Sequence, residues 1–269
     1  MVTTTGRYST DDHERFAADV RRESFCVLRG HFGRDVLGAW SDAFAPLLDE
    51  HRKTAADDPN RGPERFYVTL PFAGVFADTR IIFDPDVLAI CARLVGDDMV
   101  ICQLATDTPL RGSDMQDVHR DSPGLFPEWD VQTPPYQLAV NFPLVDVTAE
   151  NGPTEIARGT HMLSKDEGLA RIARGEAPLE PQYLTLGDVV IRDVRHLHRG
   201  TPNRSDVPRP MVVIGFSRKW LRRPEVGVRV PQSTWNALDD AQRRLLRFEP
   251  VVPDAEAVTA EEQYRAFAY

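Results

Sequence analysis

The chain has 269 residues, of which 42% are hydrophobic and 27% are charged, and its formal net charge is −9 at pH 7. This length and composition are typical of a soluble globular protein, built as one domain with helical additions or as two small domains. Because binding to a phosphate backbone needs a concentrated basic face, the acidic balance argues against nucleic acid as a partner.

The cysteines and the N-terminal segment bear on the cellular setting. Cys26, Cys91 and Cys102 are odd in number, widely spaced and set among apolar residues, which predicts buried, reduced thiols. The segment from Met1 to Asp12 has no apolar core of a secretory signal. No run approaches the ~18 apolar residues of a membrane span. We therefore expect a cytoplasmic protein with no membrane partner.

The N-terminal third is predicted to be mainly helical. Between Arg34 and Arg52 the apolar residues recur at the i, i+3, i+4 spacing of an amphipathic helix. The polar stretch over residues 54–64 contains two prolines and indicates a loop. The predicted elements here are a helix over Thr10 to Arg22, a strand over Phe25 to Leu28, the helix over Arg34 to Arg52 and a helix over Asp86 to Val95.

Beyond this point, runs rich in Val, Ile and Leu between Pro- and Gly-rich turns favour short strands. The predicted strands are Met99 to Ala105, Gln137 to Leu144, Tyr183 to Leu186, Asp188 to Val194 and Met211 to Lys219. A helix is expected near Thr234 to Phe248, before an acidic tail. Helices followed by short strands predict one α+β domain around an antiparallel barrel or sandwich.

The strand predicted over residues 137–144 has two unlike faces. Alternate positions from Leu138 to Leu144 are apolar, whereas Gln137, Ala139 and Asn141 form the other face. Because side chains alternate across a strand, the apolar face is expected to pack into the core. The second face could line a hydrated cavity or meet bulk water.

A candidate metal site begins with His119 and Asp121, which form an H-x-D motif. In a strand, residues i and i+2 point to the same face, so the two side chains can meet one ion together. A second histidine from a distant strand would complete the facial triad of non-haem iron(II) oxygenases, which leaves three coordination positions open. The motif alone is weak evidence, because a surface loop can carry the same pattern by chance.

A second motif lies downstream of the first. It consists of a Gly-Asp turn, a strand, and then spaced polar residues: Gly187, Asp188, His198, Gly200, Asn203, Ser205 and Arg209. This pattern resembles the phytanoyl-CoA dioxygenase family, in which a His-x-Gly-x-x-Asn-x-Ser segment is followed by an arginine that binds 2-oxoglutarate. The segments Asn151 to Thr154 and Gly159 to His161 are similar to two loops of the same family.

The resemblance implies a fold and a set of site residues. The fold would be α+β with a mainly β core, a double-stranded β-helix (a jelly roll of the cupin type) with N-terminal and flanking helices. His119, Asp121 and His198 would bind iron(II), and the planar guanidinium of Arg209 would bind the far carboxylate of 2-oxoglutarate. Relatives also carry a glutamine that touches 2-oxoglutarate on the strand before the H-x-D motif, and Gln103 takes that place here.

The whole chain is expected to form a single oxygenase domain, with a helical part over about residues 1–97, a jelly-roll core over about 98–220 and an extension over about 221–269. The implied activity is that of a dioxygenase dependent on Fe(II), 2-oxoglutarate and O₂. It would hydroxylate or desaturate an unactivated C–H bond of a small metabolite or natural-product intermediate and release succinate and CO₂. We expect a monomer or homodimer. One alternative is a cupin-like protein that binds metal without catalysis or without 2-oxoglutarate, and another is a degenerate β-barrel that serves as a binding module.

For several other residues near these motifs, the sequence allows two interpretations. His196 shares strand parity with His198 but lacks the spacing to the glycine and the arginine, and His161 is more typical of a loop-fixing residue than of a ligand. Arg192 and Arg195 could bind an anionic substrate or could be solvated strand charges. The aromatic residues of the proline-rich segment could form a lid over the substrate or pack in the ordinary way; they are Phe126, Trp129 and Tyr136.

Overall fold

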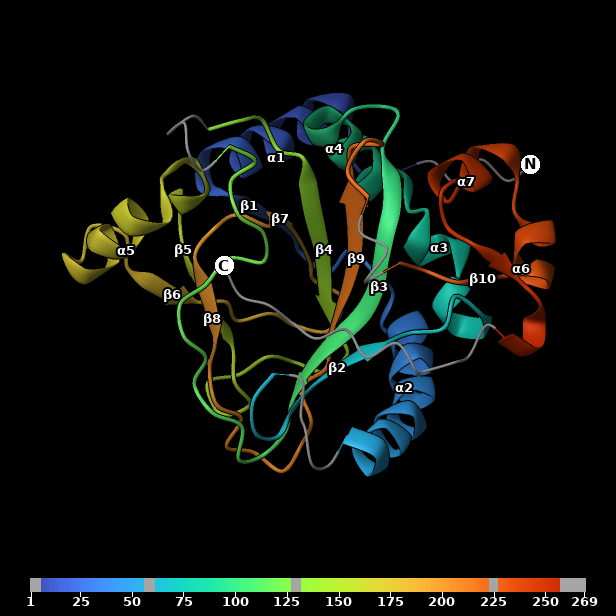
Figure 1. The fold of residues 1–269 in the computed structure, drawn as a ribbon, viewed down its shortest axis with the longest axis horizontal. Helices are drawn as coiled ribbons and strands as arrows, with labels where there is room; N and C mark the ends of the chain where they lie inside the picture. Colours follow the sequence, from blue (N-terminus) through green and yellow to red (C-terminus); the bar gives the residue numbers. More distant parts are fainter. Residues whose placement is uncertain (1–5, 56–60, 127–131, 223–226, 257–269) are drawn as a thin grey trace.

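The computed structural model describes residues 6–55, 61–126, 132–222 and 227–256 (Figure 1). The helices are α1 (Thr10–Glu23), α2 (Arg34–Ala55), α3 (Thr79–Ile82), α4 (Pro85–Val95), α5 (Lys165–Ala173), α6 (Gln232–Ala237) and α7 (Asp240–Leu245). The strands are β1 (Phe25–Leu28), β2 (Arg65–Thr69), β3 (Val100–Pro109), β4 (Gln137–Pro143), β5 (Thr154–Ala157), β6 (Leu179–Pro181), β7 (Val189–Asp193), β8 (His198–Gly200), β9 (Met211–Ser217), β10 (Val230–Pro231) and β11 (Val251–Val252).

Two antiparallel sheets form the centre of the fold. The larger has six strands in the order β1-β7-β4-β9-β3-β2, and the smaller has three in the order β6-β5-β8. Figure 1 shows the small sheet, with α5 beyond it, set to one side of the long strands β3, β4 and β9. This is a double-stranded β-helix with added helices, so the fold class predicted from the sequence is confirmed.

One face of the large sheet packs against the N-terminal helices. The apolar residues of β4 belong to the main core, together with residues of α1, α2 and α4. Phe142 of β4, for example, makes edge contacts with Phe32 and with Trp40 of α2, at ring-centroid distances of 5.2 and 5.4 Å. Figure 1 shows α1 and α4 together at one end of the long strands and α2 near the other. Because side chains alternate, the opposite face of β4 is left to line a cavity.

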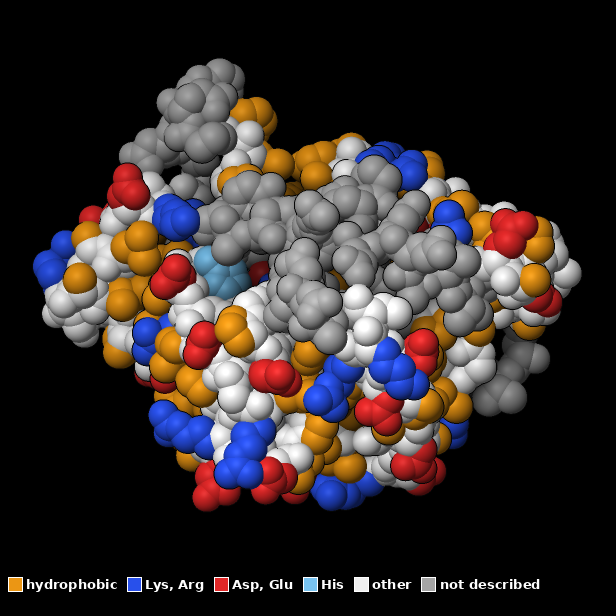
Figure 2. All heavy atoms as spheres, turned by 60° about the horizontal axis from the view of Figure 1, so that its bottom comes forward, with side chains coloured by type: hydrophobic (Ala, Val, Ile, Leu, Met, Phe, Trp, Pro, Cys, Tyr) orange, Lys and Arg blue, Asp and Glu red, His pale blue; other side chains and the backbone are white. Residues whose placement is uncertain are grey.

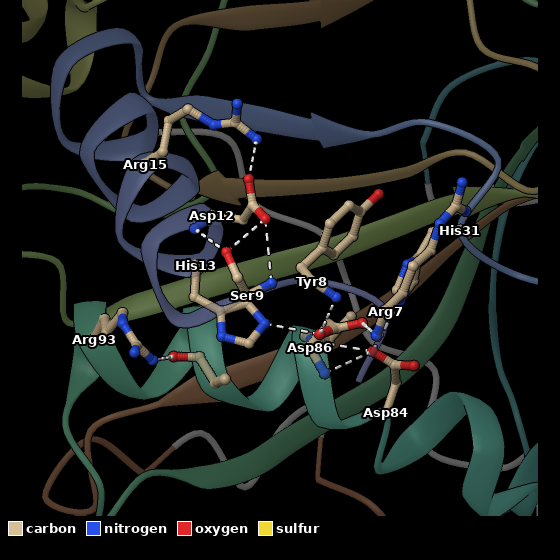
Figure 3. Close-up of polar contacts among 12 residues, drawn as sticks. Arg7, Tyr8, Ser9, Asp12, His13, Arg15, His31, Asp84, Asp86 and Arg93 are labelled. Carbon is tan, nitrogen blue, oxygen red and sulfur yellow. Dashed lines mark hydrogen bonds and ion pairs between the residues drawn. The ribbon is translucent and has the colours of Figure 1, made fainter. Parts of the chain in front are cut away.

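A buried carboxylate anchors the segment before α1 to the start of α4 (Figure 3). Asp86 accepts hydrogen bonds from the backbone N–H groups of Arg7, at 2.6 Å, and Tyr8, at 3.2 Å. Its Oδ1 also lies 2.7 Å from Nε2 of His13. Burial would raise the pKa of Asp86, but these three contacts hold it below its usual value. Residues that lie far apart in the sequence are thereby joined through one ionised side chain.

Asp84 makes a similar set of contacts beside Asp86. Its side chain accepts from the backbone N–H groups of Asp86 and Val87, which caps α4, and lies 2.9 Å from Nε2 of His31. His31, Asp84 and Asp86 are close enough together to resemble a metal site. Because both carboxylate oxygens of Asp86, Oδ1 of Asp84 and Nε2 of His31 already contact protein groups, we interpret this cluster as a structural anchor.

Three details of the predicted elements are wrong. Residues 183–186 do not form a strand, because β6 ends at Pro181 and the following turn is held by Asp188, whose side chain accepts from the N–H of Thr185. The C-terminal helix is divided in two, because Asp239 caps the new helix α7 in a capping box with Gln242. Strands β2, β5, β6, β8, β10 and β11 are absent from the prediction, since each spans five residues or fewer and carries little periodicity of its own.

The remaining general expectations concern the cysteines and the surface. All three cysteines are free and buried, as predicted. Within the part of the chain that the structure describes, no helix is long and apolar enough to cross a bilayer. On the face shown in Figure 2, acidic and basic side chains are interspersed over the described surface.

Candidate active site

A cavity lies between the two sheets. Its wall combines side chains of β3, β4, β7, β8 and β9 with those of the segments that join them. All five site residues predicted from the sequence line this one cavity: Gln103, His119, Asp121, His198 and Arg209. The second face of β4 lines it as well, through Gln137, Ala139 and Asn141, so that face meets the cavity rather than bulk water.

The two histidines are brought together by the backbone. His119 lies outside the named strands but forms an isolated antiparallel bridge with His198, the first residue of β8. The centroids of the two rings are 4.5 Å apart. Asp121 joins them, with Oδ1 at 3.5 Å from Nε2 of His198 and 4.0 Å from Nε2 of His119. One ligand atom from each residue therefore lies within 4.8 Å of the other two.

Hydrogen bonds to the backbone fix the orientation of both imidazole rings. Nδ1 of His119 lies 2.8 Å from the carbonyl oxygen of Asp117, and Nδ1 of His198 lies 3.2 Å from that of His196. With Nδ1–H donating to the carbonyl, Nε2 keeps the lone pair that a metal needs. Burial and the neighbouring His198 lower the pKa of His119 to about 4, so this ring is neutral at pH 7.

Asp121 is held ionised by its neighbours. Its Oδ2 lies 2.6 Å from Nη2 of Arg192, on β7. Burial would raise the pKa of Asp121, but the charge of Arg192 and the two imidazole rings bring it well below the usual value. Two neutral imidazoles and one carboxylate are the donor set of non-haem iron(II) sites. The residues present therefore fit a divalent metal ion.

Arg209 lies just before β9 and is fully buried. Among the described residues, none of its three guanidinium nitrogens has a hydrogen-bond partner. Burial lowers its pKa to about 10, although the charge of Asp107 works in the opposite direction. A buried cation without hydrogen bonds is costly. A carboxylate ligand would supply two parallel charge-assisted bonds to this guanidinium, so the far end of 2-oxoglutarate fits here.

Strand β2 contributes one cavity residue that sequence reasoning missed, Tyr67, and a buried arginine that contacts the cavity residue Asp107. Arg65 donates to Oδ2 of Asp107 at 2.9 Å and to the carbonyl oxygen of Thr201 at 2.9 Å. Tyr67 lines the cavity and accepts a hydrogen bond from the side-chain amide of Gln103. The only signal in the sequence was the alternation of large polar and apolar residues over 65–68, directly after the predicted loop.

Three residues that the sequence left open between binding and structural roles have structural roles. His196 is fully buried, with Nδ1 at 3.1 Å from the hydroxyl of Ser24, and lies outside the ligand cluster. His161 is also buried and contacts a backbone carbonyl oxygen through Nε2 at 3.2 Å. Arg195 forms a buried pair with Asp193, at 2.7 Å. Of the two candidate arginines, only Arg192 lines the cavity.

The remaining motif residues shape the turn after His198. The side chain of Asn203 donates to the carbonyl oxygens of Pro109 and Val207 and accepts from Ser205. Gly152 packs so closely against this turn that an added Cβ would lie 2.7 Å from the carbonyl oxygen of Thr201. These residues therefore place β8 and Arg209 rather than bind a ligand.

The three aromatic residues of the proline-rich segment have different settings. Tyr136 is buried and its hydroxyl donates to the carbonyl oxygen of Pro123, which is ordinary packing. Phe126 is largely exposed. Trp129 lies outside the described residues, so neither of its two interpretations is tested.

Comparisons with known proteins show the family of this chain. The family model of phytanoyl-CoA dioxygenase (PhyH) matches residues 20–211. Dioxygenase FrzG from Cladobotryum sp is 33% identical over 121 residues, which make up 42% of this chain and only 39% of FrzG.

Solved structures with low sequence identity share the fold. HygX from Streptomyces hygroscopicus, with nickel, 2-oxoglutarate and hygromycin B bound, has a TM-score of 0.59 at 18% identity, and the match covers 77% of this chain and 88% of HygX. SnoN, a non-haem α-ketoglutarate-dependent epimerase from nogalamycin biosynthesis, has a TM-score of 0.57 at 20% identity, with 78% and 84% of the two chains covered.

Proposed function

The chain belongs to the phytanoyl-CoA dioxygenase family, and we propose that its cavity is the active site of a dioxygenase that hydroxylates or desaturates a small metabolite. Enzymes of this family use iron(II) and 2-oxoglutarate, with O₂ as the second co-substrate. The observation that carries the proposal is the pairing, in one cavity, of the His119–Asp121–His198 cluster with the unpartnered, fully buried Arg209. A protein that only bound metal would have no use for such an arginine.

In this proposal the metal is held by Nε2 of His119, Nε2 of His198 and the carboxylate of Asp121. The backbone carbonyls behind each Nδ1 keep the two rings turned toward the ion. Iron and 2-oxoglutarate, when bound, supply the activation of O₂ and the oxidation of the substrate, with release of succinate and CO₂.

Arg209 would bind the far carboxylate of 2-oxoglutarate and so orient its other end toward the metal. The backbone of Arg209 is held in place, because its N–H donates to the carbonyl oxygen of Pro109 of β3 at 3.2 Å. Gln103 would lie beside the co-substrate, held by the hydroxyl of Tyr67. In this proposal, these residues bind and orient the co-substrate.

For the substrate we propose a small polar molecule rather than an acyl-CoA thioester. The cavity wall carries side-chain amides that suit hydroxyl or carbonyl groups, among them Gln116 and Gln182. Which C–H bond reacts depends on how the substrate lies against this wall.

The test is succinate formation by the purified protein with iron(II), 2-oxoglutarate and ascorbate, across a panel of polar metabolites. We expect slow succinate release without substrate and a marked increase with the right one. The matched control is Asp121→Ala, which removes one proposed ligand. A protein that binds iron but forms no succinate under any condition would instead support a metal-binding protein without this activity.

A further inference from the structure

We propose that Arg192 is a positioning residue that makes Asp121 a one-oxygen metal ligand, an inference that rests on the metal site proposed above. The structure gives the two carboxylate oxygens different partners. Oδ1 faces the Nε2 atoms of both histidines, at 3.5 and 4.0 Å. Oδ2 lies 2.6 Å from Nη2 of Arg192. An ion among the three ligand atoms would contact Oδ1, while Oδ2 stayed with the guanidinium.

Arg192 is itself fixed by two further strands. Its Nε donates to Oδ1 of Asn141 on β4, at 2.8 Å. The other end of that amide, Nδ2, donates to the carbonyl oxygen of Val212 on β9, at 3.0 Å. A continuous series of hydrogen bonds therefore runs from the backbone of β9 through β4 and β7 to Asp121. Both side chains are largely buried, so water competes little for these bonds.

Asp121 needs this support because its own segment is irregular. It lies outside the named strands, and its backbone N–H is held by one bond to the carbonyl oxygen of Val194, at 3.1 Å. A carboxylate can bind a metal with one oxygen or with two. One-oxygen binding leaves three of six positions for the co-substrates, whereas two-oxygen binding would remove one of them. Arg192 holds the second oxygen and so keeps that position open.

The direction in which a substitution of Arg192 changes the metal affinity distinguishes a positioning role from a purely electrostatic one. The guanidinium is positive and repels a divalent cation, so its removal would tighten metal binding if charge were its only effect. If Arg192 orients Asp121, its removal weakens metal binding, because the loss of such a supporting contact typically costs about 10–100-fold in affinity. The two roles therefore predict opposite changes.

The experiment measures Ni(II) binding by calorimetry, together with crystal structures of the Ni(II)-loaded protein. The variants are Arg192→Met, which removes the charge and the donors at similar length, and Arg192→Lys, which keeps the charge. The matched control is Arg199→Met on β8, because Arg199 is bonded to Glu155 at 2.7 Å and does not touch Asp121. We expect about tenfold or greater weakening for Arg192→Met, less for Arg192→Lys and no change for Arg199→Met.

The structure of the loaded unmodified protein is decisive even if a variant fails to fold. We expect Oδ1 of Asp121 on nickel and Oδ2 still within hydrogen-bond distance of Arg192. Nickel bound by both oxygens, or Arg192 turned away from Asp121, would overturn the inference while leaving the metal site in place. Tighter binding by Arg192→Met would also overturn it. If the unmodified protein bound no nickel at all, the proposed metal site itself would be wrong.

Discussion

His119 and His198 exchange two backbone hydrogen bonds, with N···O distances of 2.9 and 3.0 Å, although 78 residues separate them in the chain. This isolated bridge closes the irregular segment before Asp121 onto β8 and sets the distance between the two rings. The geometry of the site thus depends on backbone pairing, and substitutions of the three side chains should leave the fold in place.

We therefore predict that His119→Ala, Asp121→Ala and His198→Ala each lose tight iron binding and turnover while keeping the circular dichroism of the unmodified protein. Metal analysis after dialysis measures the iron binding, and succinate assays measure the turnover. His196→Ala is the matched comparison, because His196 contacts the ring of His198 at 5.0 Å but lies outside the ligand cluster. Iron lost from His196→Ala and kept by His198→Ala would show that the ligands are wrongly assigned.

Arg209→Met should stabilise the protein without 2-oxoglutarate and weaken the binding of 2-oxoglutarate. Without 2-oxoglutarate the variant should unfold at a higher temperature, because it replaces a buried cation that lacks hydrogen-bond partners among the described residues. With 2-oxoglutarate the affinity should fall by on the order of 2–5 kcal/mol, since the ligand carboxylate is left unpaired. Thermal melts with and without the ligand measure both effects.

Arg209→Lys is the control for this prediction. Lysine keeps a positive charge but lacks the planar pair of donors, so it should restore only part of the affinity. Equal 2-oxoglutarate affinity in Arg209→Met and in the unmodified protein would place the co-substrate anchor elsewhere.

Asp86→Asn should loosen the anchor of the N-terminal segment. We expect a loss of about 1–3 kcal/mol in the free energy of unfolding at neutral pH, because a buried acceptor of three contacts loses its charge. The pKa of Asp86 is lower in the folded protein than its usual value, so the carboxylate stabilises the fold above about pH 4 and this contribution is lost as the pH falls further.

Denaturant titrations of both proteins between pH 7 and pH 3 check this prediction. The difference in unfolding free energy should be largest near neutral pH and should shrink below about pH 4. A difference that stayed constant, or that grew as the pH fell, would show that the charge of Asp86 is not what anchors the segment.

Relative to the substrate, the product should have gained one oxygen atom or lost two hydrogen atoms, and it should have gained no chlorine. In relatives that chlorinate, a small residue replaces the carboxylate of the H-x-D motif and chloride takes its position on iron. Here Asp121 is present and its negative charge disfavours a second anion on the same metal. Mass spectrometry of the product formed in chloride-rich buffer should show a gain of one oxygen or a loss of two hydrogens. A chlorinated product would exclude Asp121 as a ligand.

The sequence predicted site residues from short motifs and from a family resemblance. His119 and Asp121 came from the H-x-D motif, whereas His198, Arg209 and Gln103 came from the resemblance to the phytanoyl-CoA dioxygenase family. The role of Arg65 and Tyr67 was not visible, since it arises from the pairing of β2 with β3, in which Tyr67 lies opposite Asp107. Such long-range register leaves no local pattern.

The two arginines near the site show a second limit. Arg192 lies within β7, so alternation correctly allows it to face the cavity, as Val190 also does. Arg195 lies beyond the end of β7 at Asp193, where the strand period no longer applies, and it turns back to bond that residue. A sequence pattern could not separate them, because it does not fix the last residue of a strand.

The most direct test of the proposed active site is an anaerobic titration of 2-oxoglutarate into the iron(II) protein, followed by the visible metal-to-ligand charge-transfer band. We predict a band that appears and saturates with one equivalent of 2-oxoglutarate in the unmodified protein, that needs far more ligand in Arg209→Met, and that is absent in Asp121→Ala. Iron bound by the unmodified protein without any such band would contradict the assignment of this cavity as a 2-oxoglutarate site.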